Sequence, residues 1–209
     1  MKEKDKIAQL RSELAEVGRK AFKRGLVPAT SGNISGRVPG TDLVLVKRTG
    51  VSLGDAEPSD YVLLDMEGNV LEGGKPSKEV RFHLGLYRAR DEVMAVFHLH
   101  PPYATSFAVL GRELPVVTAA AEAGLKTIPI VPFAPPGSRE LAEYVMEVFE
   151  DQSVVAALMA RHGIITVGPD VQTAFYRADL LEDTARVGLY VAQLQLAGTG
   201  LSGSADGKS

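Results

Sequence analysis

The residues of this sequence best suited to chemistry are two histidines that end an apolar run. The run begins at Val93, and His98 and His100 close it just before a pair of prolines. Residues two apart in an extended strand point to the same side, so both imidazoles would face one way. Neutral imidazole is a favoured ligand for zinc and similar ions. The short pattern leaves two interpretations open, a shared metal ion or a half-exposed pair on an edge strand.

The chain has four histidines, and the other two lie in different settings. His162 precedes Gly163 in a tight turn between two apolar segments, and His83 follows Glu79 by one turn of a predicted helix. Three histidines from two separate strands would leave one coordination position open, as a catalytic zinc ion requires. His162 is also typical of a turn residue that bonds to backbone, and His83 of a packed or solvated helix face.

A carboxylate near these histidines is the next candidate. Ser77 can cap a helix that runs to about Arg90, which places Glu79 in the first turn. A negative charge there is stabilised by the helix dipole, and this is the simplest account of the residue. The alternative account is a general acid and base that works beside a metal ion.

Segment 29–36 contains only small and polar residues apart from Ile34. It suits either an ordinary turn that enters a strand or a nest of backbone N–H groups and hydroxyls that binds an anion. A second turn, at 48–52, follows an apolar strand.

The elements that must position these residues alternate between helices and strands. Apolar spacing predicts helices at 7–22, 77–90, 101–110, about 139–149 and 170–194. Strands are predicted at 43–47, 61–64, 69–71, 93–100, 126–131, 153–159 and 164–167. The alanine-rich segment 118–124 receives no assignment. With no repeat and no interior linker, we expect one domain over 1–197 and a flexible tail over 198–209, which lacks apolar residues to pack.

Composition narrows the class of protein. The chain has 209 residues, 45% of them hydrophobic and 23% charged, as in a globular domain. A net charge of −3 gives no basis for nucleic-acid or anionic-membrane binding. The absence of cysteine excludes disulfides and thiolate metal sites. The charged amino terminus is unlike a secretory signal, and no apolar run approaches the roughly 20 residues that span a bilayer. We therefore expect a soluble cytoplasmic protein with no membrane or nucleic-acid partner.

Five short motifs in a fixed order give a family resemblance. They are Gly-Asn-Ile-Ser at 32–35, Thr-Gly at 49–50, Pro-Ser-Lys-Glu at 76–79, His-Leu-His at 98–100 and His-Gly at 162–163. This order resembles the class II aldolase/adducin family, most of all its L-fuculose-phosphate aldolase branch, over about residues 7–196. The resemblance implies a three-layer α/β/α fold with a central, mostly antiparallel sheet flanked by helices. It also implies a homotetramer with active sites at subunit interfaces.

The resemblance assigns roles to individual residues. It makes His98, His100 and His162 ligands of Zn²⁺, with Mn²⁺ or Co²⁺ as other metals, and it makes Glu79 the catalytic carboxylate. The phosphate pocket it implies consists of Gly32, Asn33, Thr49, Gly50 and Ser77, with Lys78 as a further cation for a phosphate or carboxylate. The implied reaction is C–C cleavage of a phosphorylated ketose through a metal-bound enediolate, giving dihydroxyacetone phosphate and an aldehyde.

Departures from the branch pattern keep other reactions open. Lys78 stands where fuculose-phosphate aldolases commonly have serine. The Lys-Glu pair at 78–79 resembles the pair found at this position in relatives that decarboxylate 3-oxo-tetronate phosphates. The segment 117–121 and the tail lack the tyrosines that the aldolases supply. The epimerase branch normally has Asp where this chain has Glu79, so the sequence disfavours a 4-epimerase. A decarboxylase and a sugar-phosphate dehydratase therefore stand as alternatives to the aldolase. A non-catalytic adducin-like interaction module is an alternative of a different class, and the presence of all three histidines argues against it.

Overall fold

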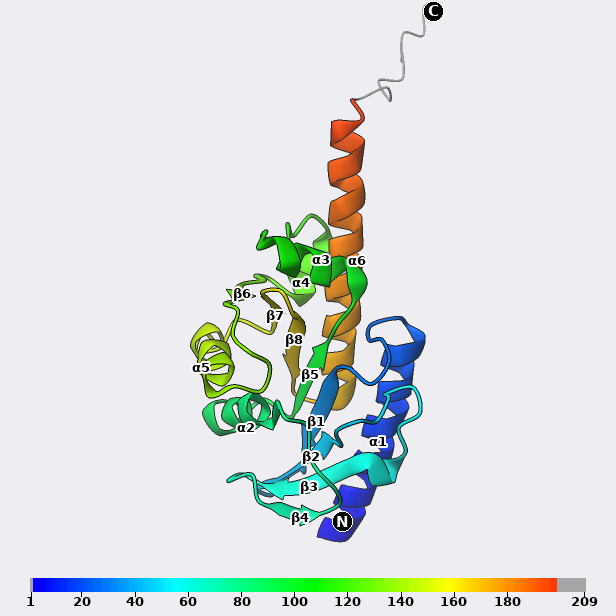
Figure 1. Ribbon diagram of the computed structural model, residues 1–209, viewed down its shortest axis with the longest axis vertical. Helices are drawn as coiled ribbons and strands as arrows, with labels where there is room; N and C mark the ends of the chain where they lie inside the picture. Colours follow the sequence, from blue (N-terminus) through cyan, green and yellow to red (C-terminus); the bar gives the residue numbers. More distant parts are fainter. Residues whose placement is uncertain (1, 199–209) are drawn as a thin grey trace, which may run out of the picture.

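The computed structural model describes residues 2–198, which form one eight-stranded sheet and six α-helices (Figure 1). The strands are β1 (Asn33–Arg37), β2 (Leu43–Lys47), β3 (Tyr61–Asp65), β4 (Val70–Glu72), β5 (Ala95–Leu99), β6 (Ile130–Val131), β7 (Ala156–Met159) and β8 (Gly163–Gly168). The helices are α1 (Glu3–Lys23), α2 (Val80–Ala89), α3 (Pro102–Leu110), α4 (Ala119–Gly124), α5 (Arg139–Val148) and α6 (Val171–Leu196), with a short 3₁₀ helix η1 (Pro58–Asp60).

The strand order in the sheet is β4-β3-β2-β1-β5-β8-β7-β6. Each neighbouring pair is antiparallel except β6 and β7, which are parallel. The predicted mostly antiparallel sheet is confirmed. This order places β5 in the centre, between β1 and β8, so the strand that carries His98 is bordered on both sides.

Helices cover both faces of the sheet and make three layers. Helices α1, α3, α4 and α6 lie on one face, and α2 and α5 lie on the other (Figure 1). Neighbouring side chains of β5 point to opposite faces of the sheet, and each face has its own apolar core. Phe97 packs in the core shared with α6, and Val96 packs in the core shared with α2. Because side chains alternate across a strand, His98 lies on the α2 face with Val96. The predicted α/β/α fold is confirmed.

Two predicted strands begin three or more residues later than expected. The strand predicted at 126–131 contains only β6, because Lys126 has a positive φ of 60° and Pro129 has no N–H for a ladder. The strand predicted from residue 153 begins at Ala156, after a turn in which the Val154 N–H donates to the Asp151 carbonyl.

Two helix assignments also change. Helix α2 begins at Val80 and not at Ser77, because the Val80 N–H bonds back to the Ser77 carbonyl in a turn. The unassigned alanine-rich segment contains α4, whose N-terminus is capped by Thr118: its hydroxyl accepts from the Ala121 N–H at 3.2 Å. Alanine favours helix, so the alanines together with Thr118 as an N-cap residue could have predicted α4 from the sequence.

Helix α6 crosses the sheet and continues beyond it as a single projecting helix (Figure 1). Most of the predicted tail, residues 199–209, lies outside the described residues, so the domain limits remain a prediction. Over residues 2–198, none of the helices has both the length and the apolar character needed to cross a bilayer.

Candidate metal centre and acid–base site

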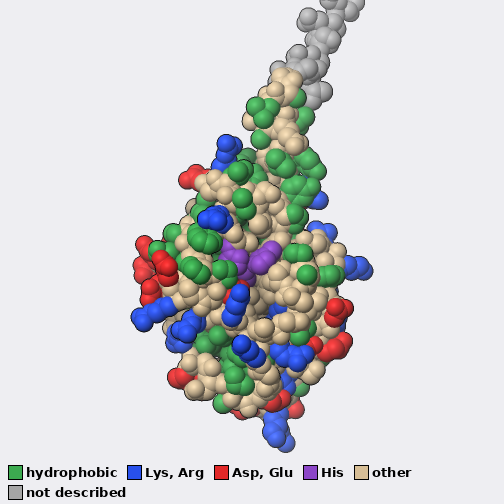
Figure 2. All heavy atoms as spheres, viewed as in Figure 1, with side chains coloured by type: hydrophobic (Ala, Val, Ile, Leu, Met, Phe, Trp, Pro, Cys, Tyr) green, Lys and Arg blue, Asp and Glu red, His purple; other side chains and the backbone are tan. Residues whose placement is uncertain are grey.

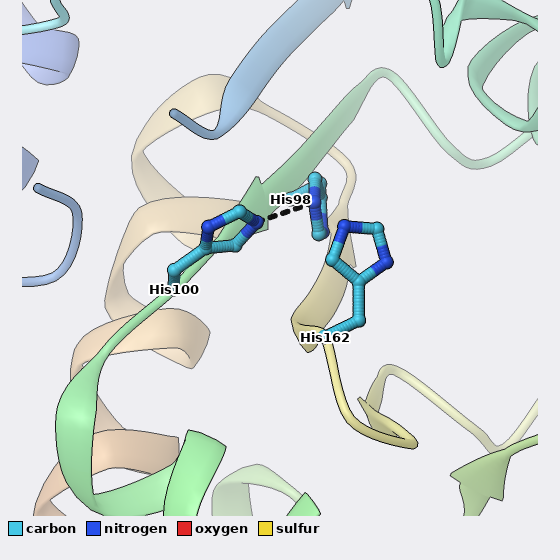
Figure 3. A group of neighbouring side chains, drawn as sticks. All are labelled: His98, His100 and His162. Carbon is cyan, nitrogen blue, oxygen red and sulfur yellow. Dashed lines mark hydrogen bonds between the residues drawn. The ribbon is translucent and has the colours of Figure 1, made fainter. Parts of the chain in front are cut away.

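Three histidines meet at one end of the central strands (Figure 3). His98 lies in β5, His100 lies one residue past its end, and His162 lies in the turn between β7 and β8. One ring nitrogen from each lies within 4.8 Å of the others. Leu99 of β5 pairs with Ile164 of β8, and this pairing brings the turn against the histidine pair. The predicted convergence of two strands on one site is confirmed.

The surroundings of the rings favour the neutral form that metal ions need. The His98 ring is fully buried, and its Nδ1 lies 2.9 Å from the Ile164 carbonyl oxygen. A carbonyl only accepts, so Nδ1 carries the proton and Nε2 presents its lone pair to the cluster. Burial lowers the pKa of His98 and of His100 to about 3, and burial also lowers the pKa of His162. All three rings are therefore uncharged near neutral pH.

Gly163 allows the approach of the turn to the histidine pair. A Cβ atom at this position would lie 2.7 Å from Cδ2 of His100 and closer still to the Leu99 carbonyl oxygen. Real Cβ atoms do not approach neighbours so closely, so a larger residue would push β8 away from the end of β5. The glycine after His162 is therefore a packing requirement of the site.

Gly163→Ala is expected to lower metal affinity by about 10-fold or more, as loss of groups that orient the ligands does. Overpacking should also lower the free energy of unfolding by about 1–3 kcal/mol. Gly188→Ala is the control, because its Cβ would meet neighbours only at 3.5 Å and beyond. Metal titration and thermal melts measure both effects, and a Gly163→Ala variant with unchanged metal affinity would contradict this packing role.

Glu79 points into the histidine cluster. Its Oε2 lies 3.4 Å from Nε2 of His98, and its Oε1 lies 3.5 Å from Nε2 of His162. The residue is only 5% exposed, and although it occupies the N-cap position of α2, its side chain makes no cap hydrogen bond to the helix. A charge placed only for the helix dipole would stay at the solvated helix end. The geometry therefore favours the acid–base interpretation over the dipole interpretation.

The donor set fits a divalent metal ion. Three neutral imidazoles face one point and leave a fourth side open, the pattern of catalytic zinc sites. Among the described residues, the buried atoms Oε1 of Glu79 and Nδ1 of His162 have no hydrogen-bond partner. Unpartnered buried polar atoms are costly, and a substrate on the bound ion would give Oε1 of Glu79 a partner. Figure 2 shows histidine side chains reaching the surface near the centre of one face, with Lys and Arg side chains close by.

The turns predicted to hold phosphate lie side by side. Lys47, at the end of β2, is 2% exposed, and its Nζ donates to the carbonyls of Thr30 (3.0 Å) and Val51. The Thr49 hydroxyl donates to the Pro76 carbonyl at 2.8 Å. Hydrogen bonds therefore join the segments 30–33, 49–51 and 75–78. Burial lowers the pKa of Lys47 to about 8.

Within this group of turns, individual side chains differ in what they face. Gly32 and Gly50 have positive φ of 67° and 82°, which glycine adopts readily. Asn33 is buried, and its amide Nδ2 donates to Oε2 of Glu79 at 2.8 Å. Ser77 Oγ accepts from the Glu79 N–H at 3.3 Å. The Asn33 amide thus serves the carboxylate in this structure, while Gly32 is buried and Gly50 is exposed. Lys78 is exposed at the edge of the site.

Sequence reasoning missed several residues that support the site. Lys47 ends an apolar strand, and nothing in its spacing distinguishes it from a surface lysine. His83 does not join the metal cluster; it is fully buried and hydrogen-bonded, which agrees with the packed alternative. A usable signal existed in α2: Glu79, His83 and Tyr87 recur every four residues and so share one helix face.

The fold and the site together define a class of protein, an α/β/α domain with an open three-histidine site beside a buried carboxylate. The family model "Class II Aldolase and Adducin N-terminal domain" matches residues 12–189. The chain belongs to the class II aldolase/adducin family, as the motifs indicated.

Named relatives fall into two groups. An L-fuculose phosphate aldolase of Methanococcus maripaludis is 35% identical over 184 residues, covering 88% of this chain and 98% of the relative. A 3-oxo-tetronate 4-phosphate decarboxylase of Escherichia coli is 33% identical over 183 residues, covering 85% of each. The crystal structure of L-fuculose-1-phosphate aldolase from Thermus thermophilus superposes with a TM-score of 0.79 at 28% identity, covering 91% of this chain and 98% of that one.

Proposed function

We propose that the protein is a zinc-dependent lyase that cleaves a C–C bond of a phosphorylated ketose to give dihydroxyacetone phosphate and an aldehyde. The observation that carries the proposal is the placement of the Glu79 carboxylate at 3.4 and 3.5 Å from two of three neutral histidines. The aldolase and decarboxylase relatives have in common that each is a lyase acting on a phosphorylated sugar or sugar acid. The names of the relatives do not decide between the two reactions, and they do not name the metal.

The side chains divide the work as follows. A divalent ion bound by His98, His100 and His162 supplies a Lewis acid for the negative charge that develops on substrate oxygens. Glu79 takes and returns the substrate proton at Oε1, the oxygen that has no partner among the described residues. Its other oxygen is held by the Asn33 amide at 2.8 Å, which fixes the plane of the carboxylate.

The joined turns hold the phosphate. Backbone N–H groups around Gly32 and Gly50 can surround an anion, and Lys47 fixes the two turns at one separation through its carbonyl contacts. Binding energy from a phosphate that does not react positions the carbons that do. Burial lowers the pKa of Lys47 to about 8, which is still above 7. The Lys47 ammonium therefore stays positively charged at neutral pH and favours an anion at the two turns that it contacts.

Decarboxylation of a phosphorylated 3-oxo acid is the second candidate. Two observations favour it: Lys78 is exposed at the edge of the site, and decarboxylases match this chain almost as closely as aldolases do. In this reaction the C–C bond to a carboxylate breaks, carbon dioxide leaves, and the electron pair stays on the substrate carbon until it is protonated. Lys78 would bind the carboxylate before it leaves.

Product analysis separates the two reactions. Zinc-loaded protein is incubated with L-fuculose 1-phosphate and, separately, with a 3-oxo-tetronate 4-phosphate. We expect dihydroxyacetone phosphate from the first substrate, measured by coupled reduction with NADH. Release of carbon dioxide from the second substrate with no dihydroxyacetone phosphate from the first would replace the aldolase by the decarboxylase. A purified chain that binds no zinc, cobalt or manganese would favour the adducin-like interaction module.

A homotetramer with active sites at subunit interfaces is also part of the proposal. The projecting end of α6 exposes large apolar side chains, and so does the end of α3. They are Tyr190, Leu194 and Leu196 on α6, and Val109 and Leu110 on α3. Exposed apolar surface of this kind is typical of protein–protein contacts. Light scattering should give about four times the chain mass of 22.3 kDa, and a monomeric mass would contradict this part.

A further inference from the structure

Behind Glu79, four buried polar side chains form a series of hydrogen bonds that leads away from the metal centre. Asn33 contacts Glu79, and the Asn33 amide oxygen contacts Nε2 of His83. Nδ1 of His83 lies 2.7 Å from the Ser35 hydroxyl, which lies 2.6 Å from the Tyr87 hydroxyl. All four are 3% exposed or less. Such a series is costly unless each member has a partner, and here each one does.

The chemistry of the groups gives every bond one direction. The Glu79 carboxylate is the acceptor from Asn33, so the Asn33 NH₂ group faces it and the amide oxygen faces His83. That oxygen only accepts, so His83 carries its proton on Nε2 and leaves Nδ1 as an acceptor. The Ser35 hydroxyl then donates to Nδ1 and accepts from the Tyr87 hydroxyl. Each donor therefore points toward Glu79.

We propose that His83 is a positioning residue for Glu79: held in its Nε2–H tautomer by Ser35 and Tyr87, it fixes the orientation of the Asn33 amide that holds the carboxylate. This role concerns the acid–base site around Glu79, and the effect expected on turnover rests on the proposed function. His83 itself contacts none of the three metal-binding histidines through a hydrogen bond among the described residues.

The surroundings of His83 support a fixed ring. It stacks on Phe82 with ring centroids 4.7 Å apart, and it has no exposed surface. Burial lowers the pKa of His83 to about 3, which agrees with a ring that carries one proton. If the tautomer were reversed, Nε2 and the Asn33 amide oxygen would face each other as two acceptors. The amide would then turn over and present its oxygen to the carboxylate.

The first test compares two substitutions at one position. His83→Leu removes the N–H that holds Asn33, whereas His83→Gln can still donate to the Asn33 oxygen. We expect His83→Leu to lower kcat by about 10²-fold, the scale of loss from a misplaced catalytic group, with KM within about 2-fold. His83→Gln should recover most of the turnover. Zinc content should stay at the wild-type value in both variants, because the three ligands are untouched.

The second test compares Tyr87, which belongs to the series, with Tyr61, an equally buried tyrosine outside it. Tyr87 and Tyr61 are both fully buried, and each hydroxyl makes a hydrogen bond, that of Tyr61 to the Leu14 carbonyl at 2.9 Å. Tyr87→Phe should lower kcat several-fold because it removes a member of the series. Tyr61→Phe should leave kcat unchanged at a comparable loss of thermal stability. Equal kinetic effects from both would overturn the proposal, because they would reflect stability alone.

A spectroscopic arm is independent of turnover. Nitrogen-15 NMR of the zinc-loaded wild-type protein reports which nitrogen of each histidine carries the proton, and the His83→Gln spectrum assigns the signal. We expect the Nε2–H tautomer at His83, and a Nδ1–H or doubly protonated ring would overturn the proposal even if the protein is inactive on both substrates. If the wild-type protein turns over substrate and His83→Leu does so equally well, the positioning role is overturned while the proposed function stands.

Discussion

Glu79→Gln is expected to lower turnover by about 10²-fold or more, as loss of a general acid and base does. Glutamine keeps the size of the side chain and an oxygen that accepts from the Asn33 amide, so the local packing should survive. The metal should remain bound, because the imidazoles supply the ligands. Steady-state kinetics on the zinc-loaded variant, with its metal content and melting temperature, measure all three expectations.

A matched control separates catalysis from helix stabilisation. Glu140 lies in the first turn of α5, exposed to solvent, and therefore has the role that a helix-dipole charge would have. Glu140→Gln should leave turnover unchanged. If Glu79→Gln also retained near-normal turnover, Glu79 would be no more than a charge at the start of a helix, and the acid–base part of the proposal would fail.

His98→Ala is expected to abolish metal binding at working concentrations and turnover with it. Loss of a direct ligand should exceed the roughly 10–100-fold that loss of a supporting residue costs. The substitution also leaves the Ile164 carbonyl without the ring N–H that now lies 2.9 Å away. Some loss of stability is therefore expected, and the readout is metal stoichiometry of the folded fraction.

His83→Gln provides the comparison for His98→Ala. Both rings are fully buried on the same side of the sheet, but only His98 belongs to the metal cluster. Retention of metal in His83→Gln and loss in His98→Ala would assign the effect to ligation. Equal metal content in the His98→Ala variant and the wild-type protein would show that the ion binds elsewhere or without this ring.

Much of the framework could be predicted from local pattern. The two-residue spacing of His98 and His100 places both rings on one side of a strand, and β5 ends at Leu99, as the following prolines suggest. Helical spacing locates α1, α3, α5 and α6 within a few residues. These predictions succeed because strand alternation and helix periodicity are properties of short segments.

The assembly of the site depends on contacts that no short segment specifies. His162 reaches the other two histidines only because β8 pairs with β5, through residues as distant in the chain as Leu99 and Ile164. Asn33 reaches Glu79 because β1 lies on the other side of β5, with Asn33 opposite His98. Periodicity alone does not predict that the three histidines meet, whereas the family resemblance does.

Side-chain partners are the least predictable feature. The resemblance assigns Asn33 to the phosphate pocket, whereas in the structure its amide is directed at the carboxylate. Lys47 is predicted only as the end of a strand, and in the structure it joins the two turns that contain Thr30 and Val51. Both outcomes follow from burial, which obliges a polar group to find partners among whatever lies nearby. The sequence shows the groups but not their neighbours.

The central claim, that the three histidines hold the metal on which turnover depends, is tested most directly by metal removal and restoration on the wild-type protein. We expect chelation to release one zinc ion per chain and to abolish product formation from the sugar phosphate. Stoichiometric zinc should restore it, and zinc absorption spectra of the restored protein should show three imidazole ligands. Turnover that persists in the fully metal-free protein, or zinc bound without imidazole ligands, would contradict the claim.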